Sequence, residues 1–266
     1  MLIIGEKING SIPSVKKLVE NYAENQLVAL ARQQAEAGAD FIDINVATGS
    51  GSRTDEIKTM QWAVTTLQTN LQTPLCVDSA DPAVLEAGLS ALNGRACMIN
   101  STSAERGRLE RIVPLALSFD AQLVALPIDD NGIPQNVTDR LKICTTIVET
   151  CMRFGFPVEK LLFDPLVLPL ATDNRQGRIT LNTLAEIKSA FPVARTVMGL
   201  SNVSFGLPRR KKLNQALLYM AVHAGLDAVI ADPLDEDLMT AIKAAEALAG
   251  LDRHCRRYIR ASRNKT

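Results

Sequence analysis

Short apolar runs alternate along the chain with longer stretches in which apolar residues recur every three or four positions. Short runs of this kind are typical of strands buried on both faces, and the longer spacing is typical of amphipathic helices. The clearest helical stretch places Leu141, Cys144, Ile147, Val148 and Cys151 on one face. The pattern predicts eight strands, at Leu2–Ile4, Phe41–Val46, Leu75–Asp78, Ala96–Asn100, Gln122–Pro127, Leu161–Asp164, Thr196–Leu200 and Ala228–Asp232.

Regular alternation of strands and helices predicts an α/β protein, an eight-fold (β/α) TIM barrel. A final helical stretch is expected from about Glu236 to Leu251. The competing architecture is an open doubly wound sheet, which normally carries a Gly-x-Gly-x-x-Gly turn after its first strand. This chain has Gly5-Glu-Lys-Ile-Asn-Gly10 there instead. We therefore expect one domain over residues 1–266, with the tail from about residue 252 peripheral to the barrel.

Composition narrows the functional classes. The 29 lysines and arginines balance 29 aspartates and glutamates, so no global field draws the chain to nucleic acid or to a membrane. The apolar start, Met1–Ile4, is too short for a signal peptide, and no later run is long enough for a membrane span. Five cysteines without a Cys-x-x-Cys pair favour reduced thiols that fill core space over disulfides or zinc. We expect a cytoplasmic protein that binds no metal.

Four of the predicted strands lead into a carboxylate or a carboxamide. These residues are Asp78, Asn100, Asp164 and Asn202. In a barrel, residues at the carboxyl ends of the strands converge on one mouth. Two aspartates and two asparagines without a metal-ligand signature form a hydrogen-bonding set that suits a flat, nitrogen-rich heterocycle.

Aspartate and asparagine beside a helix are usually caps, so each candidate is first tested against that role. After Asp78, the pair Asp81-Pro82 forms a natural cap with proline at the first helical position. After Asn100, Thr102-x-x-Glu105 predicts a capping box. Asp78 and Asn100 are therefore expected to be free of capping duty.

The other two candidates lie before prolines. Asp164 precedes Pro165, which favours an extended conformation that aims its side chain off the strand end. Asn202 lies six residues before Pro208, the expected helix start, which is too far for a cap. Each residue alone fits a structural role as well as a functional one, and the shared strand-end position is what favours function.

Further acidic residues are weaker candidates. Glu6, just after the first predicted strand, and the Asp43-x-Asn45 pair in the second are candidates to face the barrel interior. A buried acid must pair or bind a ligand, because an unpaired buried charge is too costly. Asp232 and Asp235 follow the last strand, where a capping role is favoured over catalysis.

Histidines and basic clusters complete the inventory. His223 and His254 lie on helical stretches away from strand ends, and no His-Glu-x-x-His or Gly-x-Ser-x-Gly motif is present. The run Arg209-Arg-Lys-Lys212 stands at an expected helix start, where the helix dipole disfavours cations. It indicates either an anionic ligand or partner at the mouth or an ordinary solvated surface. The basic tail, Arg253–Lys265, is expected to be a terminal helix with a frayed end.

Six short motifs stand in matching order with those of a known family. They are Gly5-Glu-Lys-Ile-Asn9, Asp43-Ile-Asn45, Val77-Asp-Ser79, Ile99-Asn-Ser-Thr102, Asp164-Pro-Leu166 and Gly199-Leu-Ser-Asn-Val-Ser204. With them the chain resembles the pterin-binding methyltransferases, above all the methyltetrahydrofolate:corrinoid protein methyltransferases of acetogenic and O-demethylating systems. The folate domain of cobalamin-dependent methionine synthase is a more distant relative. The resemblance implies the eight-fold barrel and a homodimer.

The resemblance also implies roles for the strand-end residues. Asp164 and Asn100 would grip the amide-and-amidine edge of a reduced pterin, and Asn202 would hydrogen-bond N5 while its methyl group leaves. Asp78 would support that step through water and so counts, with Asn202, as catalytic. The substrate-binding set is Asp164, Asn100, Asp78, Gly199, Ser201 and Asn202, with Glu6, Asp43, Asn45 and Arg210 as further candidates.

Departures from related families shape the expected reaction. The chain lacks the Asp-x-His-x-x-Gly motif that ligates cobalamin, so a corrinoid would arrive on a separate protein. It also lacks the zinc-thiolate homocysteine module of methionine synthase. The expected activity is methyl transfer between tetrahydrofolate and that corrinoid. The alternatives are a condensation like that of dihydropteroate synthase, whose opening Asn-Val-Thr-Pro-Asp-Ser-Phe signature is missing, and a pterin-binding module without catalysis.

Overall fold

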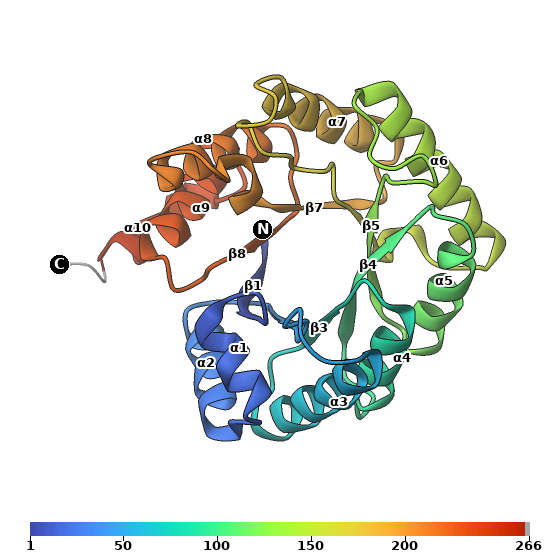
Figure 1. Cartoon of the computed structure of the whole chain (residues 1–266). Coiled ribbons are helices and arrows are strands. Elements are labelled where there is room, and N and C mark those ends of the chain that lie inside the picture. Colours follow the sequence, from blue (N-terminus) through green and yellow to red (C-terminus); the bar gives the residue numbers. More distant parts are fainter. Residues whose placement is uncertain (264–266) are drawn as a thin grey trace.

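Eight parallel strands pair in sequence order and close into a barrel, with β1 bonded to both β2 and β8 (Figure 1). The computed structural model describes residues 1–263. The predicted TIM barrel is confirmed, and each predicted strand is present. The strands are β1 (Leu2–Asn9), β2 (Phe41–Asn45), β3 (Leu75–Asp78), β4 (Cys97–Ser103), β5 (Gln122–Leu126), β6 (Leu161–Phe163), β7 (Arg195–Gly199) and β8 (Ala228–Ala231).

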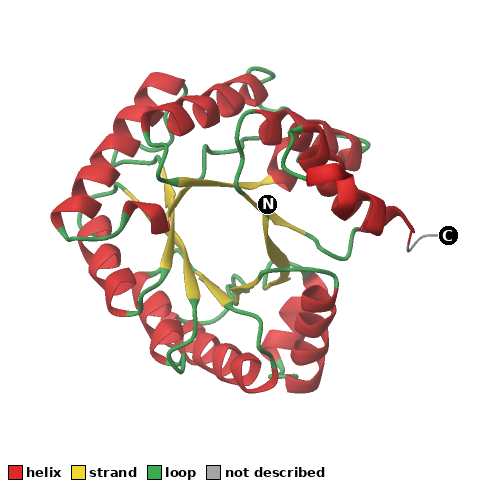
Figure 2. Ribbon diagram, turned by 180° about the vertical axis from the view of Figure 1, so that it is seen from behind, coloured by secondary structure: helices red, strands yellow, loops and turns green. Residues whose placement is uncertain are grey.

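Helices surround the strands on the outside of the barrel, and Figure 2 shows this ring from behind. The α-helices are α1 (Pro13–Glu20), α2 (Glu24–Glu36), α3 (Arg53–Asn70), α4 (Pro82–Ser90), α5 (Arg108–Ser118), α6 (Val137–Arg153), α7 (Gln176–Ala190), α8 (Arg210–His223), α9 (Glu236–Leu248) and α10 (Arg256–Arg263). Short 3-10 turns are η1 (Val158–Lys160), η2 (Leu200–Ser204) and η3 (Arg253–Cys255). Within the described residues, no helix is both long and apolar enough to cross a membrane.

Two strands run further than their sequence patterns indicate. Strand β1 continues past a register shift to pair Asn9 with Asn45, so Glu6 lies inside the strand and not after it. Strand β4 continues to Ser103 by pairing with β5. The capping box expected from Thr102 to Glu105 was therefore wrong, because helix α5 begins only at Arg108. Asn100 still caps no helix, because it lies within β4.

Two predicted caps are confirmed. Asp81 accepts a hydrogen bond from the N–H of Ala83 at the start of α4, and Asp235 caps α9. The thiols of Cys76, Cys97, Cys144 and Cys151 are free and buried, and Cys255 is free and exposed.

The centre of the barrel is filled by one inward-facing residue from each strand. These residues form one apolar cluster: Ile4, Phe41, Cys76, Met98, Val124, Leu162, Val197 and Ala228. Separate apolar clusters fill the space between the strands and the helices. The barrel is thus a packed core, and ligand chemistry is confined to its open end.

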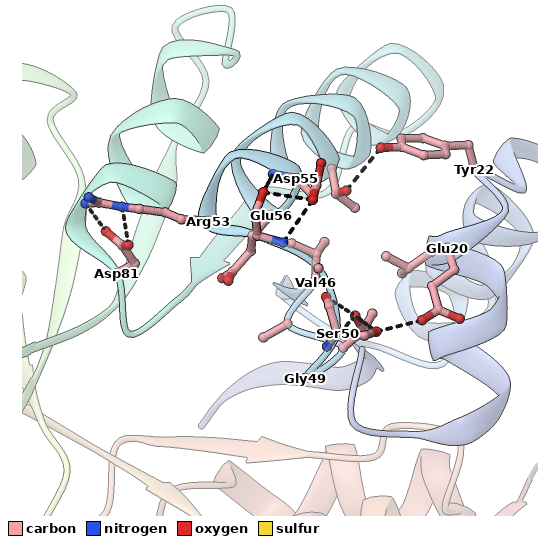
Figure 3. Close-up of a pocket in the computed structure, with 15 residues that line it drawn as sticks. Glu20, Tyr22, Val46, Gly49, Ser50, Arg53, Asp55, Glu56 and Asp81 are labelled. Carbon is pink, nitrogen blue, oxygen red and sulfur yellow. Dashed lines mark hydrogen bonds and ion pairs between the residues drawn. The ribbon is translucent and has the colours of Figure 1, made fainter.

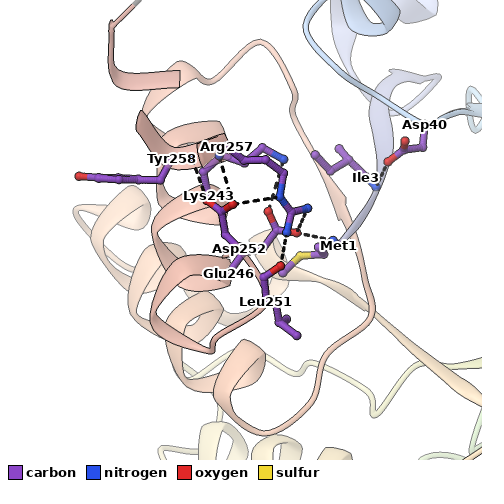
Figure 4. Close-up of polar contacts among 9 residues, drawn as sticks. All are labelled: Met1, Ile3, Asp40, Lys243, Glu246, Leu251, Asp252, Arg257 and Tyr258. Atoms are coloured by element: carbon purple, nitrogen blue, oxygen red, sulfur yellow. Dashed lines mark hydrogen bonds and ion pairs between the residues drawn. The ribbon is translucent and has the colours of Figure 1, made fainter. Parts of the chain in front are cut away.

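A cluster of charges around Glu246 joins α9 to α10 and to the start of the chain (Figure 4). The buried carboxylate of Glu246 lies 2.5 Å from the amino group of Met1 and 3.0 Å from Nη1 of Arg257. Lys243 and Asp252 extend the cluster. The predicted terminal helix is confirmed as α10, which Arg257 ties to the barrel, and the frayed end expected after it lies outside the described residues.

Candidate functional site

Side chains along a strand alternate between its two faces. The residue two positions after each member of the apolar layer therefore also points into the barrel, closer to the mouth. On five strands this second layer is polar or backbone only. Its members are Glu6, Asp43, Asp78, Asn100 and Gly199. Asp164, directly after β6, continues that strand, since its N–H donates to the carbonyl of Ala125 at 3.0 Å. The structure thus brings the predicted strand-end residues together at one end of the barrel.

Strands β2, β3 and β4 share a hydrogen-bonded network. Asn45 donates from Nδ2 to Oδ2 of Asp78 at 2.8 Å, and Asn100 donates from Nδ2 to Oδ1 of Asp43 at 3.3 Å. Burial and then the charge of Asp78 raise the pKa of Asp43 well above its usual range, while the Cys76 thiol donates to it. Asp43 is hydrogen-bonded to Asp78, whose pKa burial raises to about 6.

Asp164 is held by backbone donors from two sides. The N–H of Leu166 donates to Oδ1 of Asp164 at 2.8 Å, and the N–H of Gly199 also donates to this carboxyl. Burial raises the pKa of Asp164 to about 6, although these two donors and the nearby Arg140 guanidinium oppose the rise. The carboxyl group is largely ionised at neutral pH, and the residue as a whole is half-buried.

Asn202 lies on the η2 turn that follows β7. Its Nδ2 atom lies 3.5 Å from the place where a Cβ on Gly199 would stand, so the carboxamide folds back over the strand end. The turn is fixed from α8, because Arg210 donates to the carbonyl of Ser201 at 2.7 Å and to Oγ of Ser204 at 3.0 Å. Arg210, a candidate pterin ligand by sequence, therefore contacts the chain on both sides of Asn202.

Glu6 is the fourth acid of the site with a raised pKa. Burial and, next, the charge of Asp232 raise its pKa to about 7, against the opposing charges of Lys7 and Arg210. Lys7 itself donates from Nζ to Oδ2 of Asp232 at 2.9 Å. Glu6 therefore exchanges its proton near neutral pH, within reach of the charge of Arg210, which holds the turn that carries Asn202.

A cavity of about 560 Å³ lies beside the mouth, against the loop that follows β2 (Figure 3). Its polar side chains are largely paired with one another. The pairs are Arg53 with Asp81, Ser52 with Asp55, Ser50 with Glu20, and Tyr22 with Thr59. The strand-end side chains are also partly paired, but burial raises the pKa of each of their acids, Glu6, Asp43, Asp78 and Asp164. Acids with raised pKa values cluster at functional sites, so we take the strand ends as the site.

Sequence reasoning missed the arginines behind the site. Arg140 on α6 and Arg108 on α5 donate to backbone carbonyls next to the strand-end residues. Neither arginine belongs to a sequence motif, and Arg140 is completely buried although it is charged. The only sequence signal was an arginine close to a helix start. Among the described residues, no group of three or more His, Cys, Asp or Glu side chains is placed to hold a metal ion.

This barrel, with a carboxylate-and-carboxamide layer at its mouth, is that of the pterin binding enzymes. The chain belongs to this family, which it matches over residues 10–232. It is 37% identical over 268 residues to the methylcorrinoid:tetrahydrofolate methyltransferase of Eubacterium limosum, an alignment that covers 99% of this chain and 96% of the relative. It is 30% identical over 245 residues to methionine synthase of Mycobacterium leprae (strain TN), which covers 86% of this chain and 20% of that protein.

Solved structures share the fold at lower identity. Dihydropteroate synthase from Clostridium difficile, determined in the presence of pteroic acid, superposes with a TM-score of 0.72 at 19% identity and covers 93% of this chain and 96% of that one. The Yersinia pestis enzyme with a pterine-sulfa conjugate gives a TM-score of 0.68 at 18% identity and covers 94% of each chain. At these identities the likeness establishes the barrel and nothing finer.

Proposed function

We propose that this chain is a methyltransferase that moves a methyl group between N5 of tetrahydrofolate and the cobalt of a corrinoid carried by a separate protein. The observation that carries the proposal is the strand-end layer itself, in which Asp164, Asn100 and Asp78 present acceptors and donors at one mouth. Family membership and the Eubacterium limosum relative support the same chemistry.

The pterin edge explains why these residue types are wanted. A reduced pterin offers donors at N3 and at the 2-amino group, beside carbonyl and ring-nitrogen acceptors. The ionised Asp164 accepts two such donors in parallel, and its backbone partners Leu166 and Gly199 keep it oriented while it does so. Asn100 donates to Asp43, which leaves its carboxamide oxygen for the ligand.

Methyl transfer requires tetrahydrofolate to leave as its N5–carbon bond breaks. A hydrogen bond at N5 makes it a better leaving group, and we assign that bond to Asn202, whose carboxamide folds over the end of β7. A contact that strengthens as the bond breaks lowers the barrier more than it improves binding. Asp78, with a pKa of about 6, supports the step through water by exchanging a proton near neutral pH.

The corrinoid is a substrate in this proposal, and another protein delivers it. The sequence lacks the Asp-x-His-x-x-Gly motif, and its two histidines, His223 and His254, lie on α8 and η3. The open barrel mouth is where such a carrier would present cobalt to N5. The proposal places the protein in cytoplasmic one-carbon metabolism of the O-demethylating or acetogenic type.

The test mixes the protein with methyltetrahydrofolate and Co(I) cobalamin and follows the visible spectrum. Catalysed formation of methylcobalamin supports the proposal, and the reverse mixture measures the other direction. Tight folate binding without transfer to free or protein-bound corrinoid would instead favour a binding module. Turnover of pterin pyrophosphate with aminobenzoate would favour the condensation.

We also propose that the protein is a homodimer. An apolar groove of about 620 Å³ runs between α7 and α8, and Met220 on its edge is 57% exposed. A second copy of the chain packed on these helices would cover the groove and leave the barrel mouth open. Sedimentation at micromolar concentration should give twice the 28.9 kDa of the chain, and a single 28.9 kDa species would count against the dimer.

A further inference from the structure

Three arginines on the helices behind the mouth share one arrangement. Each donates to a backbone carbonyl one or two residues from a strand-end residue of the site. Arg108 on α5 donates to the carbonyls of Ala80 and Ser101, Arg140 on α6 to those of Pro165 and Leu166, and Arg210 on α8 to that of Ser201. Their acceptors follow Asp78, Asn100 and Asp164 and precede Asn202.

Arg140 is the most deeply buried of the three arginines. It is 0% exposed, and its Nη1 lies 2.7 Å from the carbonyl oxygen of Pro165 and 3.0 Å from that of Leu166. Its Nε donates to the carbonyl of Pro134 at 3.0 Å. The hydroxyl of Thr180 on α7 donates to the same Leu166 carbonyl at 3.0 Å. The loop after β6 is thus held from two helices.

The held loop fixes Asp164 directly. The N–H of Leu166 donates to the Asp164 carboxyl, while its carbonyl accepts from Arg140. Leu166 has a φ of +65°, a conformation that a non-glycine residue adopts only when its surroundings hold it there. The orientation of the Asp164 carboxylate therefore depends on contacts that Arg140 supplies.

We propose that Arg140 is a positioning residue for the pterin site, which holds Asp164 in its binding orientation through the carbonyls of Pro165 and Leu166. The proposal rests on the proposed role of Asp164 in folate binding. A planar guanidinium with several fixed donors satisfies both carbonyls at once, which an ammonium group on a flexible stem does not reproduce. Arg140 also places a positive charge near Asp164.

Arg95 offers a matched control. It also donates from Nη1 to a backbone carbonyl, that of Leu71, but this residue lies before β3, at the end of the barrel opposite the mouth. Loss of this contact removes an arginine–carbonyl bond of the same type without touching the site. Arg95→Met should therefore lower the thermal unfolding temperature and leave the folate Kd unchanged.

The first measurement is tetrahydrofolate binding by titration in the wild type, Arg140→Lys, Arg140→Met and Arg95→Met, each also examined by thermal unfolding. Arg140→Lys should weaken binding by roughly ten-fold, the low end of the losses found when the hydrogen-bond partners of metal ligands are removed. If Arg140→Met does not fold, Thr180→Val takes its place. This variant removes one hydrogen bond to the Leu166 carbonyl and keeps the charge of Arg140, and we expect a several-fold weaker folate Kd.

The second measurement is the pH dependence of binding. The groups that act on the Asp164 carboxyl are the Arg140 guanidinium from α6 and the N–H groups of Leu166 and, from β7, Gly199. Arg140→Met removes the charge, so the pKa of Asp164 rises and the loss of binding on acidification moves to higher pH. A purely structural loss would lower affinity equally at every pH.

Two results would overturn the proposal. One is wild-type folate affinity in folded Arg140→Lys, and the other is an equal loss of affinity in Arg95→Met. If the wild type itself binds no folate, it is the proposed function that fails. The unfolding temperatures of the variants then report only how much each arginine contributes to stability.

Discussion

Replacing Asp164 by asparagine keeps the shape of the side chain but removes its charge and one acceptor oxygen. In the protein this carboxylate accepts from the N–H groups of Leu166 and Gly199, and under the proposed function it also accepts from two pterin donors. The asparagine would keep one acceptor for those donors and turn an NH2 group towards the other. Folate binding should therefore weaken sharply, while the remaining oxygen keeps the bond from the N–H of Leu166.

The magnitude follows from the lost interactions. A hydrogen bond to a charged group contributes about 1.5–3 kcal/mol, and a buried donor without a partner costs about 1–3 kcal/mol. A net loss of about 3 kcal/mol corresponds to a rise in Kd of roughly 150-fold. The pH dependence should change too. Because the pKa of Asp164 is raised to about 6, its ionised form is lost as pH falls through 6, and binding weakens there.

The assay is titration of tetrahydrofolate into the wild type and Asp164→Asn from pH 7.5 to 5. The variant should bind weakly throughout, and its affinity should fall less steeply with acid, since only Asp78 with a pKa of about 6 and Glu6 still titrate. Asp173→Asn is the matched control, because Asp173 pairs with Arg175 on the exposed loop before α7. A folded Asp164→Asn variant with wild-type affinity at pH 7.5 would refute the assignment of Asp164.

Three further outcomes are expected. Asn202→Ala should lower the maximal methyl-transfer rate more than folate affinity, in stopped-flow rates against titrations; lost affinity with an unchanged rate would contradict its leaving-group role. Glu246→Gln should lower the free energy of unfolding by about 3 kcal/mol, because the buried amino group of Met1 loses its counter-charge, with folate binding unchanged in a parallel titration. Thermal unfolding of the ligand-free protein should occur at higher temperature at pH 5.5 than at pH 8. Because the pKa values of Glu6, Asp78 and Asp164 are raised in the folded protein, the folded state binds more protons than the unfolded state at pH 5.5. An unfolding temperature that is not higher at pH 5.5 than at pH 8 would argue against these pKa values.

The strand ends were predictable because a parallel barrel brings its carboxyl ends together whatever the loops do. Asp78 and Asn100 were found by asking which polar residues no helix would use as caps, and Asp81 does cap α4 as expected. The conclusion that Asn100 caps no helix was right, but the capping box from which it was drawn does not exist.

Strand lengths and the residues behind the site were not predictable in the same way. Strand β4 reaches Ser103 because β5 offers it partners, and β1 reaches Asn9 through a register shift against β2. Both depend on neighbouring strands and not on local pattern. Arg140 carries a charge yet is fully buried, which only the loop carbonyls that surround it explain.

Arginines that hold main-chain carbonyls make the loops around the mouth tolerant of substitution. Arg108 binds the carbonyl oxygens of Ala80 and Ser101, which any amino acid would supply. The side chains at these positions are therefore available for redesign, so long as the arginine and the backbone path are kept. A library built at residues 80 and 101 would reshape the edge of the mouth, where the proposed corrinoid carrier would dock, and the anchoring of the backbone after Asp78 and Asn100 would not depend on which residues it introduced.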